Sequence, residues 1–258
     1  MLLPAKLAFF QTIAADLESF LTNFQSNAPM APLLYEALMD TLSVVMRRFV
    51  RKHILDSSSN ITKINLNNIE NLSSPKLADL GIPVKKELAL ATSDKKKKPL
   101  PEAYELTFWK ECRDVLATFC TSLCGNSPLR YSLTKSISCF DPTVALKSKS
   151  RAVSRITTAL ETFVENNWFS GILAEKMKRG FVDVLEMPLF QENMKNFSIS
   201  DRLDDLWMSQ IPYEDKFSPL RSFLKMVLIL SHGNAFVERG FSINREILIE
   251  NLSEVSLI

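Results

Sequence analysis

Cysteine and histidine side chains are the first candidates for chemistry in this sequence of 258 residues. The two histidines are His53 and His232, and the cysteines are Cys112, Cys120, Cys124 and Cys139. Zinc modules bring their ligands together in short, regular pairs, and this spacing matches none of them. We therefore expect no metal and no cofactor. Free, buried thiols in a reducing compartment are the favoured interpretation of the cysteines.

An acid and an arginine near the C-terminus stand in an apolar frame. Glu238 and Arg239 lie between Phe236 and Phe241, shortly after Gly233. Glycine suits the end of a helix, and the residue after it, an asparagine, suits the cap of a following helix predicted over 235–250. An acid in the first turns of that helix is stabilised by the positive end of the helix dipole. Taken alone, this pattern indicates a helix start rather than a catalytic centre.

The stretch 231–242 resembles the C-terminal signature of hAT-superfamily DNA transposases, which contains the pattern N-A-x-x-E-R-x-F-S. Segments 3–10, 20–25 and 203–207 resemble helical parts of the same family. The resemblance implies a domesticated, transposase-derived protein that dimerises, with itself or with a related transposase-derived protein. The residues it implicates are Asn234, Ala235, Phe236, Glu238, Arg239, Phe241, Ser242, Ile247 and Leu248. The alternative for the apolar members of this set is packing in the core of the chain itself.

Active hAT transposases hold divalent metal ions with two aspartates and one glutamate on a ribonuclease-H-like fold. Glu238 matches the family's glutamate. The family's aspartates follow strands, whereas Asp16 and Asp40 stand in predicted helices. The resemblance thus implies a non-catalytic chain, made of a helical insertion-type domain and the C-terminal helices of a truncated ribonuclease-H-like fold. The alternative is a fragment of an active transposase whose DNA-binding finger and two aspartates lie upstream.

Basic residues gather at two places, although the net charge is only +2. The run Lys95, Lys96, Lys97 and Lys98 precedes a proline, and Lys147, Lys149 and Arg151 form a second cluster. Such a run is typical of a solvated loop or a nuclear-import signal, and less so of a phosphate contact. We expect a nuclear protein, otherwise a cytoplasmic one, with weak nucleic-acid binding as an alternative function.

Apolar residues spaced by three and four predict a mainly α-helical protein. Apolar stripes of this kind occur on four segments: 7–24, 34–50, 106–123 and 153–163. Ser218 and Pro219 are expected to open another helix, with the serine as its cap. Trp109, Trp168 and Trp207 are interpreted as helix-packing residues. No apolar run reaches membrane-spanning length, so no membrane partner is expected.

Three segments are predicted along the chain. A helical segment covers 1–55, and a polar and basic loop region covers 56–101, with a short strand at Thr62–Leu66. A helical C-terminal region covers 102–258. The lysine run at 95–98 marks the boundary before the last segment, because like charges repel and the following proline interrupts a helix.

Overall fold

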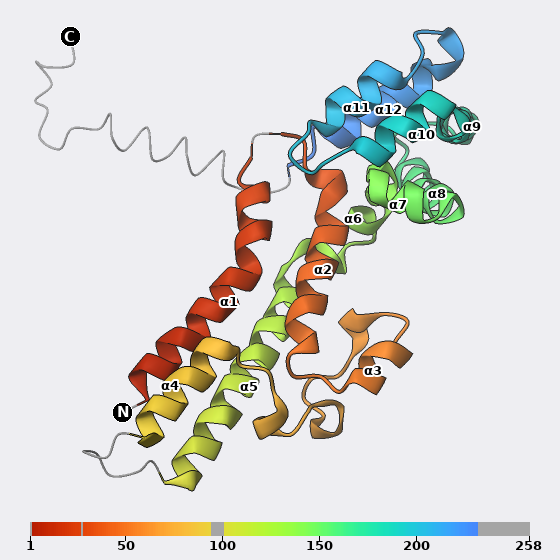
Figure 1. Ribbon diagram of the computed structural model, residues 1–258. Coiled ribbons are helices and arrows are strands. Elements are labelled where there is room, and N and C mark those ends of the chain that lie inside the picture. The colour runs from red at the N-terminus through yellow and green to blue at the C-terminus, as the bar shows by residue number, and fades with distance from the viewer. Residues whose placement is uncertain (1, 27, 94–100, 232–258) are drawn as a thin grey trace, which may run out of the picture. The chain divides into compact units, whose positions relative to one another are not determined.

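Helices make up the fold. The computed structural model describes residues 2–26, 28–93 and 101–231, and these contain helices and short 3-10 turns but no strand (Figure 1). The mainly α-helical class is therefore confirmed. The chain divides into two compact units: unit 1 is Met1–Leu21 with Tyr35–Lys135, and unit 2 is Thr22–Leu34 with Ser136–Ile258.

Unit 1 is built on long helices joined by a stretch of short turns. Its α-helices are α1 (Leu3–Phe24, whose last residues belong to unit 2), α2 (Leu34–Arg47), α3 (Lys52–Ser57), α4 (Ile82–Ser93) and α5 (Glu102–Asn126). Its 3-10 turns are η2 (Ile61–Lys63), η3 (Ile69–Asn71), η4 (Pro75–Leu77) and η5 (Pro128–Arg130). Helix α6 (Ser132–Ile137) follows and crosses into unit 2 along the chain.

Helices α1, α2, α4 and α5 share one hydrophobic core. Phe9 of α1, Leu42 of α2, Val84 of α4 and Leu116 of α5 are all buried in it. Helix α5, from the predicted segment 102–258, thus packs into the same core as α1 and α2, from the predicted segment 1–55. The expected stripe on α5 is buried at its centre, at Trp109 and the cysteine three residues on, as the spacing predicts.

Three of the cysteines are buried and the fourth, Cys124, is half-buried; none of the four forms a disulfide. Burial raises the pKa of Cys112 and of Cys120 to about 12, because the core solvates a thiolate poorly. Burial also raises the pKa of the Cys124 and Cys139 thiols. These thiols therefore stay neutral at physiological pH, and act as small apolar side chains.

The raised thiol pKa values predict a loss of stability at alkaline pH. Above pH 9 the unfolded chain releases thiol protons that the folded chain keeps up to about pH 12, so the folded state binds more protons and stability falls as pH rises. Each fully buried thiol contributes a slope of up to about 1.4 kcal/mol per pH unit. Urea unfolding between about pH 9 and 11 should be less pH-dependent for the Cys112→Ala/Cys120→Ala variant than for the wild type. Equal slopes would contradict this account.

The strand predicted at 62–66 is wrong. The segment begins with the 3-10 turn η2, whose cap is Asn60: its side-chain oxygen accepts hydrogen bonds from the backbone N–H (3.0 Å) and the hydroxyl (2.8 Å) of Thr62. A side-chain acceptor of this kind competes with strand pairing. An isolated antiparallel bridge between Val50 and Leu72 connects the region to the end of α2, and the N–H of Asp79 donates a 2.7 Å hydrogen bond to the carbonyl oxygen of Arg48. Helix α4 was also not expected inside the predicted loop region.

Unit 2 is a bundle of shorter helices. They are α7 (Pro142–Lys147), α8 (Lys149–Glu165), α9 (Gly171–Glu186), α10 (Pro188–Asn196), α11 (Leu203–Gln210) and α12 (Ser218–Leu228), with 3-10 turns η1 (Ala31–Leu33), η6 (Ser138–Phe140) and η7 (Asp215–Phe217). Aromatic rings fill the core. Trp207 is fully buried, stacks on Phe181 at 5.7 Å between centroids and meets the edge of Phe140 at 5.1 Å. Its indole N–H also donates a 2.8 Å hydrogen bond to the carbonyl oxygen of Phe140.

Two expectations in unit 2 are wrong. Ser218 is not a cap: the preceding turn η7 already directs the chain into α12, so Ser218 has helical angles and its side chain makes no cap hydrogen bond. Trp168 is not a packing residue on a helix. It lies in the turn after α8, is 65% exposed, and its ring is perpendicular to that of Phe163. The packing interpretation is confirmed for Trp109 and Trp207, which are buried.

Candidate functional site

The signature residues that the sequence singled out lie outside the described residues. This holds for Asn234, Ala235, Phe236, Glu238, Arg239, Phe241, Ser242, Ile247 and Leu248, for His232, and for the basic run Lys95–Lys98. The second basic cluster is described. Its lysine at position 149 is exposed on α8 and forms an ion pair of 2.9 Å with Glu186, which reduces the positive charge it can offer a phosphate.

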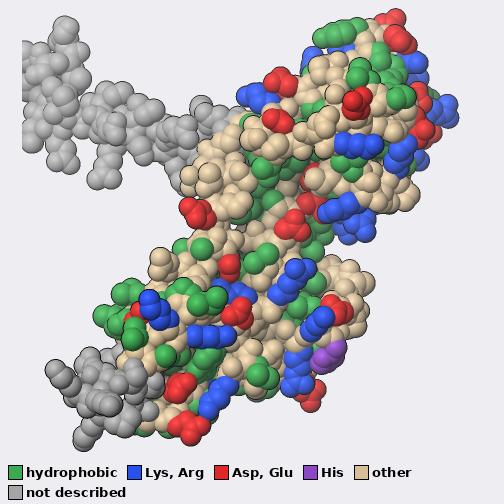
Figure 2. Space-filling view, viewed as in Figure 1, with side chains coloured by type: hydrophobic (Ala, Val, Ile, Leu, Met, Phe, Trp, Pro, Cys, Tyr) green, Lys and Arg blue, Asp and Glu red, His purple; other side chains and the backbone are tan. Residues whose placement is uncertain are grey.

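Helix α1 has the orientation opposite to the one its apolar stripe suggests. Leu7 is 61% exposed, Phe10 56% and Leu21 50%, and Leu3 at the start of the helix is 65% exposed. The stripe continues through Ala14, which is exposed, and Leu17, which is half-buried and also packs against the unit 1 core at one edge of the row. We call these residues the α1 outer face: Leu3, Leu7, Phe10, Ala14, Leu17 and Leu21. Figure 2 shows hydrophobic side chains gathered over the N-terminal part of this helix.

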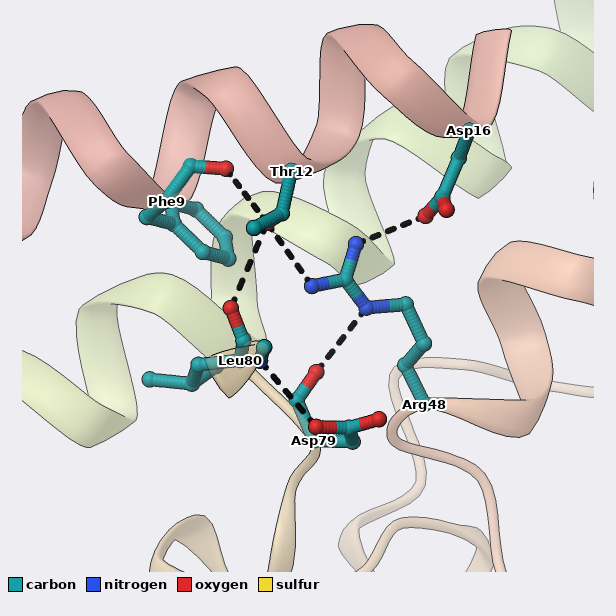
Figure 3. Close-up of polar contacts among 7 residues, drawn as sticks. Phe9, Thr12, Asp16, Arg48, Asp79 and Leu80 are labelled. Carbon is teal, nitrogen blue, oxygen red and sulfur yellow. Dashed lines mark hydrogen bonds and ion pairs between the residues drawn. The ribbon is translucent and has the colours of Figure 1, made fainter. Parts of the chain in front are cut away.

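A clamp centred on Arg48 holds α1 in this orientation (Figure 3). The Arg48 guanidinium donates to a carboxylate oxygen of Asp16 at 2.7 Å, to the hydroxyl of Thr12 at 3.0 Å and to the carbonyl oxygen of Asp79 at 2.9 Å. The Thr12 hydroxyl lies 2.8 Å from the carbonyl oxygen of Phe9 and 3.2 Å from that of Leu80, so its single proton is shared between them. The two α1 side chains in the clamp are one helical turn apart and must both face inward.

The clamp explains why the outer face points away from the core. At about 100° per residue, every member of the outer face lies roughly 140–220° around the helix from Thr12. Fixing Thr12 and Asp16 toward Arg48 therefore turns the stripe outward. The inner face is completed by apolar side chains that enter the unit 1 core: Ala5, Ala8, Phe9 and Ile13.

Gly81 completes the clamp where the chain passes beneath α1. Its φ of +97° lies in the region that side chains rarely adopt, and a Cβ added there would lie 2.7 Å from Cγ2 of Thr12. Its backbone N–H donates a 3.0 Å hydrogen bond to a carboxylate oxygen of Asp79. Only glycine satisfies both the backbone angle and the close approach to α1.

We expect Gly81→Ala to lower the free energy of unfolding by about 2 kcal/mol, because it strains the backbone and displaces Thr12. Gly125 offers a matched control: it stands near the end of α5, and nothing lies within 4 Å of its added Cβ. There Gly125→Ala should be neutral or stabilise the protein by up to about 1 kcal/mol. Urea denaturation followed by circular dichroism measures both, and equal effects would contradict the assigned role of Gly81.

The outer face of α1 is poor in charge as well as apolar. Only Lys6, Asp16 and Glu18 are charged in the whole helix. Lys6 pairs with Glu111 of α5 at 3.3 Å and Asp16 belongs to the clamp, which leaves Glu18 beside the outer face. Large apolar side chains in a continuous row, with little charge among them, are typical of a surface that another protein covers.

We find no arrangement of side chains that suggests catalysis in the described part of the chain. Within it, no group of three or more His, Cys, Asp or Glu side chains is placed to hold a metal ion. A hollow of about 350 Å³ in unit 2 is lined by Glu161, Glu165, Glu175 and Lys178 together with apolar groups, a mixture without a nucleophile and base in contact. Asp16 and Asp40 lie on helices, as expected. No described helix is long and apolar enough to cross a membrane.

Comparisons with protein-family models, with curated proteins and with solved structures find no match to this chain. The resemblance to hAT transposases therefore stays a prediction from the sequence segments named above.

The clamp residues were missed at the level of sequence. From the sequence, Arg48 is only a basic residue near the end of the helix predicted over 34–50, and Asp16 is only an acid in a predicted helix. They are 32 positions apart, and no local pattern joins them. The stripe on α1 was recognised, but a periodic pattern does not say which side of the helix meets the core.

Proposed function

We propose that this chain is a non-catalytic, transposase-derived protein whose role is to bind another protein. The observation that supports this most strongly is the α1 outer face. Its exposed leucines and phenylalanine form a row over five turns of one rigid helix. Ancestry in the hAT transposases is proposed from the sequence resemblance alone.

The way α1 is built favours a binding surface over an incidental one. Exposed hydrophobic residues scattered singly are normal on any protein, but a continuous row is not. The Arg48 clamp contacts α1 only on its inner side. A partner can therefore bind the outer face without breaking any of the clamp hydrogen bonds. A preorganised surface of this kind loses less entropy on binding.

Recovery of partners from the cells that express the protein tests this function. The tagged full-length chain should co-purify at least one protein that the Leu7→Glu/Phe10→Glu variant does not, and the purified pair should bind directly. The matched control is Ile172→Glu/Leu189→Glu, which places the same charges on exposed apolar residues of unit 2 that lie on α9 and α10. If both variants retain the same partners as the wild type, the α1 outer face is not a binding surface and the proposal fails.

A further inference from the structure

We infer that the α1 outer face binds the same face of a second copy of this chain, with the two helices antiparallel. The inference deepens the proposed function and rests on it. It assigns the surface an occupant, a register and an orientation.

The spacing of the outer face is that of a coiled-coil seam. Its members follow one another at intervals of four, three, four, three and four residues from Leu3 to Leu21. Hydrophobic residues repeating every 3.5 positions on average are what a helix needs to pack along a second helix. The same spacing would also fit a groove on another protein, so the choice of a second copy rests on how the side chains of two such faces match.

Side-chain volume selects the antiparallel orientation. If two copies pair about Thr12 as the midpoint, Leu3 faces Leu21, Leu7 faces Leu17 and Phe10 faces Ala14 of the partner helix. The largest side chain of the row then meets the smallest in both halves of the seam. A parallel pair in register would set Phe10 against Phe10 and Ala14 against Ala14, one layer crowded and one underfilled.

Charge and symmetry agree with this pairing. None of the six seam residues is charged. Of the charged residues of α1, Lys6 and Asp16 form ion pairs inside their own chain, and Glu18 lies beside the row. An identical patch on each copy gives a closed two-fold interface, which ends at a dimer instead of a filament. The antiparallel arrangement also opposes the two helix dipoles favourably.

The size of the face predicts a weak dimer. Four large apolar side chains, each half to two-thirds exposed, offer on the order of 400 Å² per copy, or about 800 Å² in total. Stable, specific interfaces bury about 1,200 Å² or more in total, so a face of this size suits only a weak or transient complex. We therefore expect reversible association with a dissociation constant in the micromolar range.

Charges placed at the two ends of the seam test the register. Leu3 and Leu21 are both exposed, so substituting them should leave the fold intact. In the antiparallel pair, Leu3→Glu/Leu21→Lys places opposite charges together at both ends, whereas Leu3→Lys/Leu21→Lys places like charges together. Sedimentation of the full-length chain over a concentration series should show dimerisation kept by the first variant and weakened about tenfold or more by the second.

Each other outcome overturns the inference. In a parallel dimer both variants juxtapose like charges, so equal loss in the two would exclude the antiparallel register. A wild type that stays monomeric at high micromolar concentration would exclude the second copy, while the co-purification of another protein through the same face would leave the proposed function standing. A monomer whose free energy of unfolding falls on Leu7→Glu would show that the face is covered from within the chain.

Discussion

Replacing Trp207 by alanine should lower the free energy of unfolding of unit 2 by about 4 kcal/mol. The side chain is fully buried, and its ring contacts Phe140, Phe181 and Phe190, the last at 4.6 Å between centroids. Removing it opens a cavity that three fixed rings cannot fill. The carbonyl oxygen of Phe140 also loses its hydrogen bond from the indole.

Two further substitutions sharpen this test. Trp207→Phe keeps part of the volume but not the hydrogen bond, and should cost less than alanine. Trp168→Ala removes the same residue type from an exposed turn and should cost less than about 1 kcal/mol. Urea denaturation followed by circular dichroism suits all three, since it does not depend on tryptophan emission. Comparable losses for Trp168→Ala and Trp207→Ala would contradict the aromatic core described for unit 2.

Replacing Arg48 by methionine should lower the free energy of unfolding of unit 1 by about 2–3 kcal/mol. The Arg48 side chain is 10% exposed and that of Asp16 27%, so the loss should be smaller than for a fully buried pair. Methionine keeps much of the volume but leaves the Asp16 carboxylate and the carbonyl oxygen of Asp79 without their donor. Amide hydrogen exchange in α1 should accelerate, because the clamp fixes that helix to the rest of the unit.

The neighbouring Arg47 supplies the control. It is the last residue of α2, carries the same charge and is exposed. Arg47→Met should change stability by less than about 0.5 kcal/mol. If the two arginine variants were equally destabilised, the helix C-terminus and not the clamp would account for the effect.

The sequence predicted well those helices whose apolar stripe meets the core. On α8, Ile156, Leu160 and Phe163 are buried as their spacing indicates, and on α12 Phe223 and Leu224 are buried too. A helical period is a local property, so it can be recognised in a single segment of the chain. The polar, turn-rich start of the region 56–101 can be recognised for the same reason, although the strand predicted at 62–66 is not formed.

The direction in which α1 faces could not be predicted in this way. It depends on Arg48 reaching Thr12 and Asp16 from a different helix, and on Gly81 allowing the chain to pass beneath α1. These are long-range contacts, and each residue taken alone has an ordinary local explanation. The candidate site therefore emerged from the fold: a stripe that periodicity alone would assign to the core is held on the surface.

The mass of the full-length chain in solution, measured by light scattering after size exclusion over a concentration series, tests the central claim most directly. We predict a concentration-dependent dimer that becomes monomeric with Leu7→Glu/Phe10→Glu and stays dimeric with Phe241→Asp, which changes the signature region instead. A dimer that survives the α1 variant and is lost with Phe241→Asp would contradict the account and return the interface to residues 231–258.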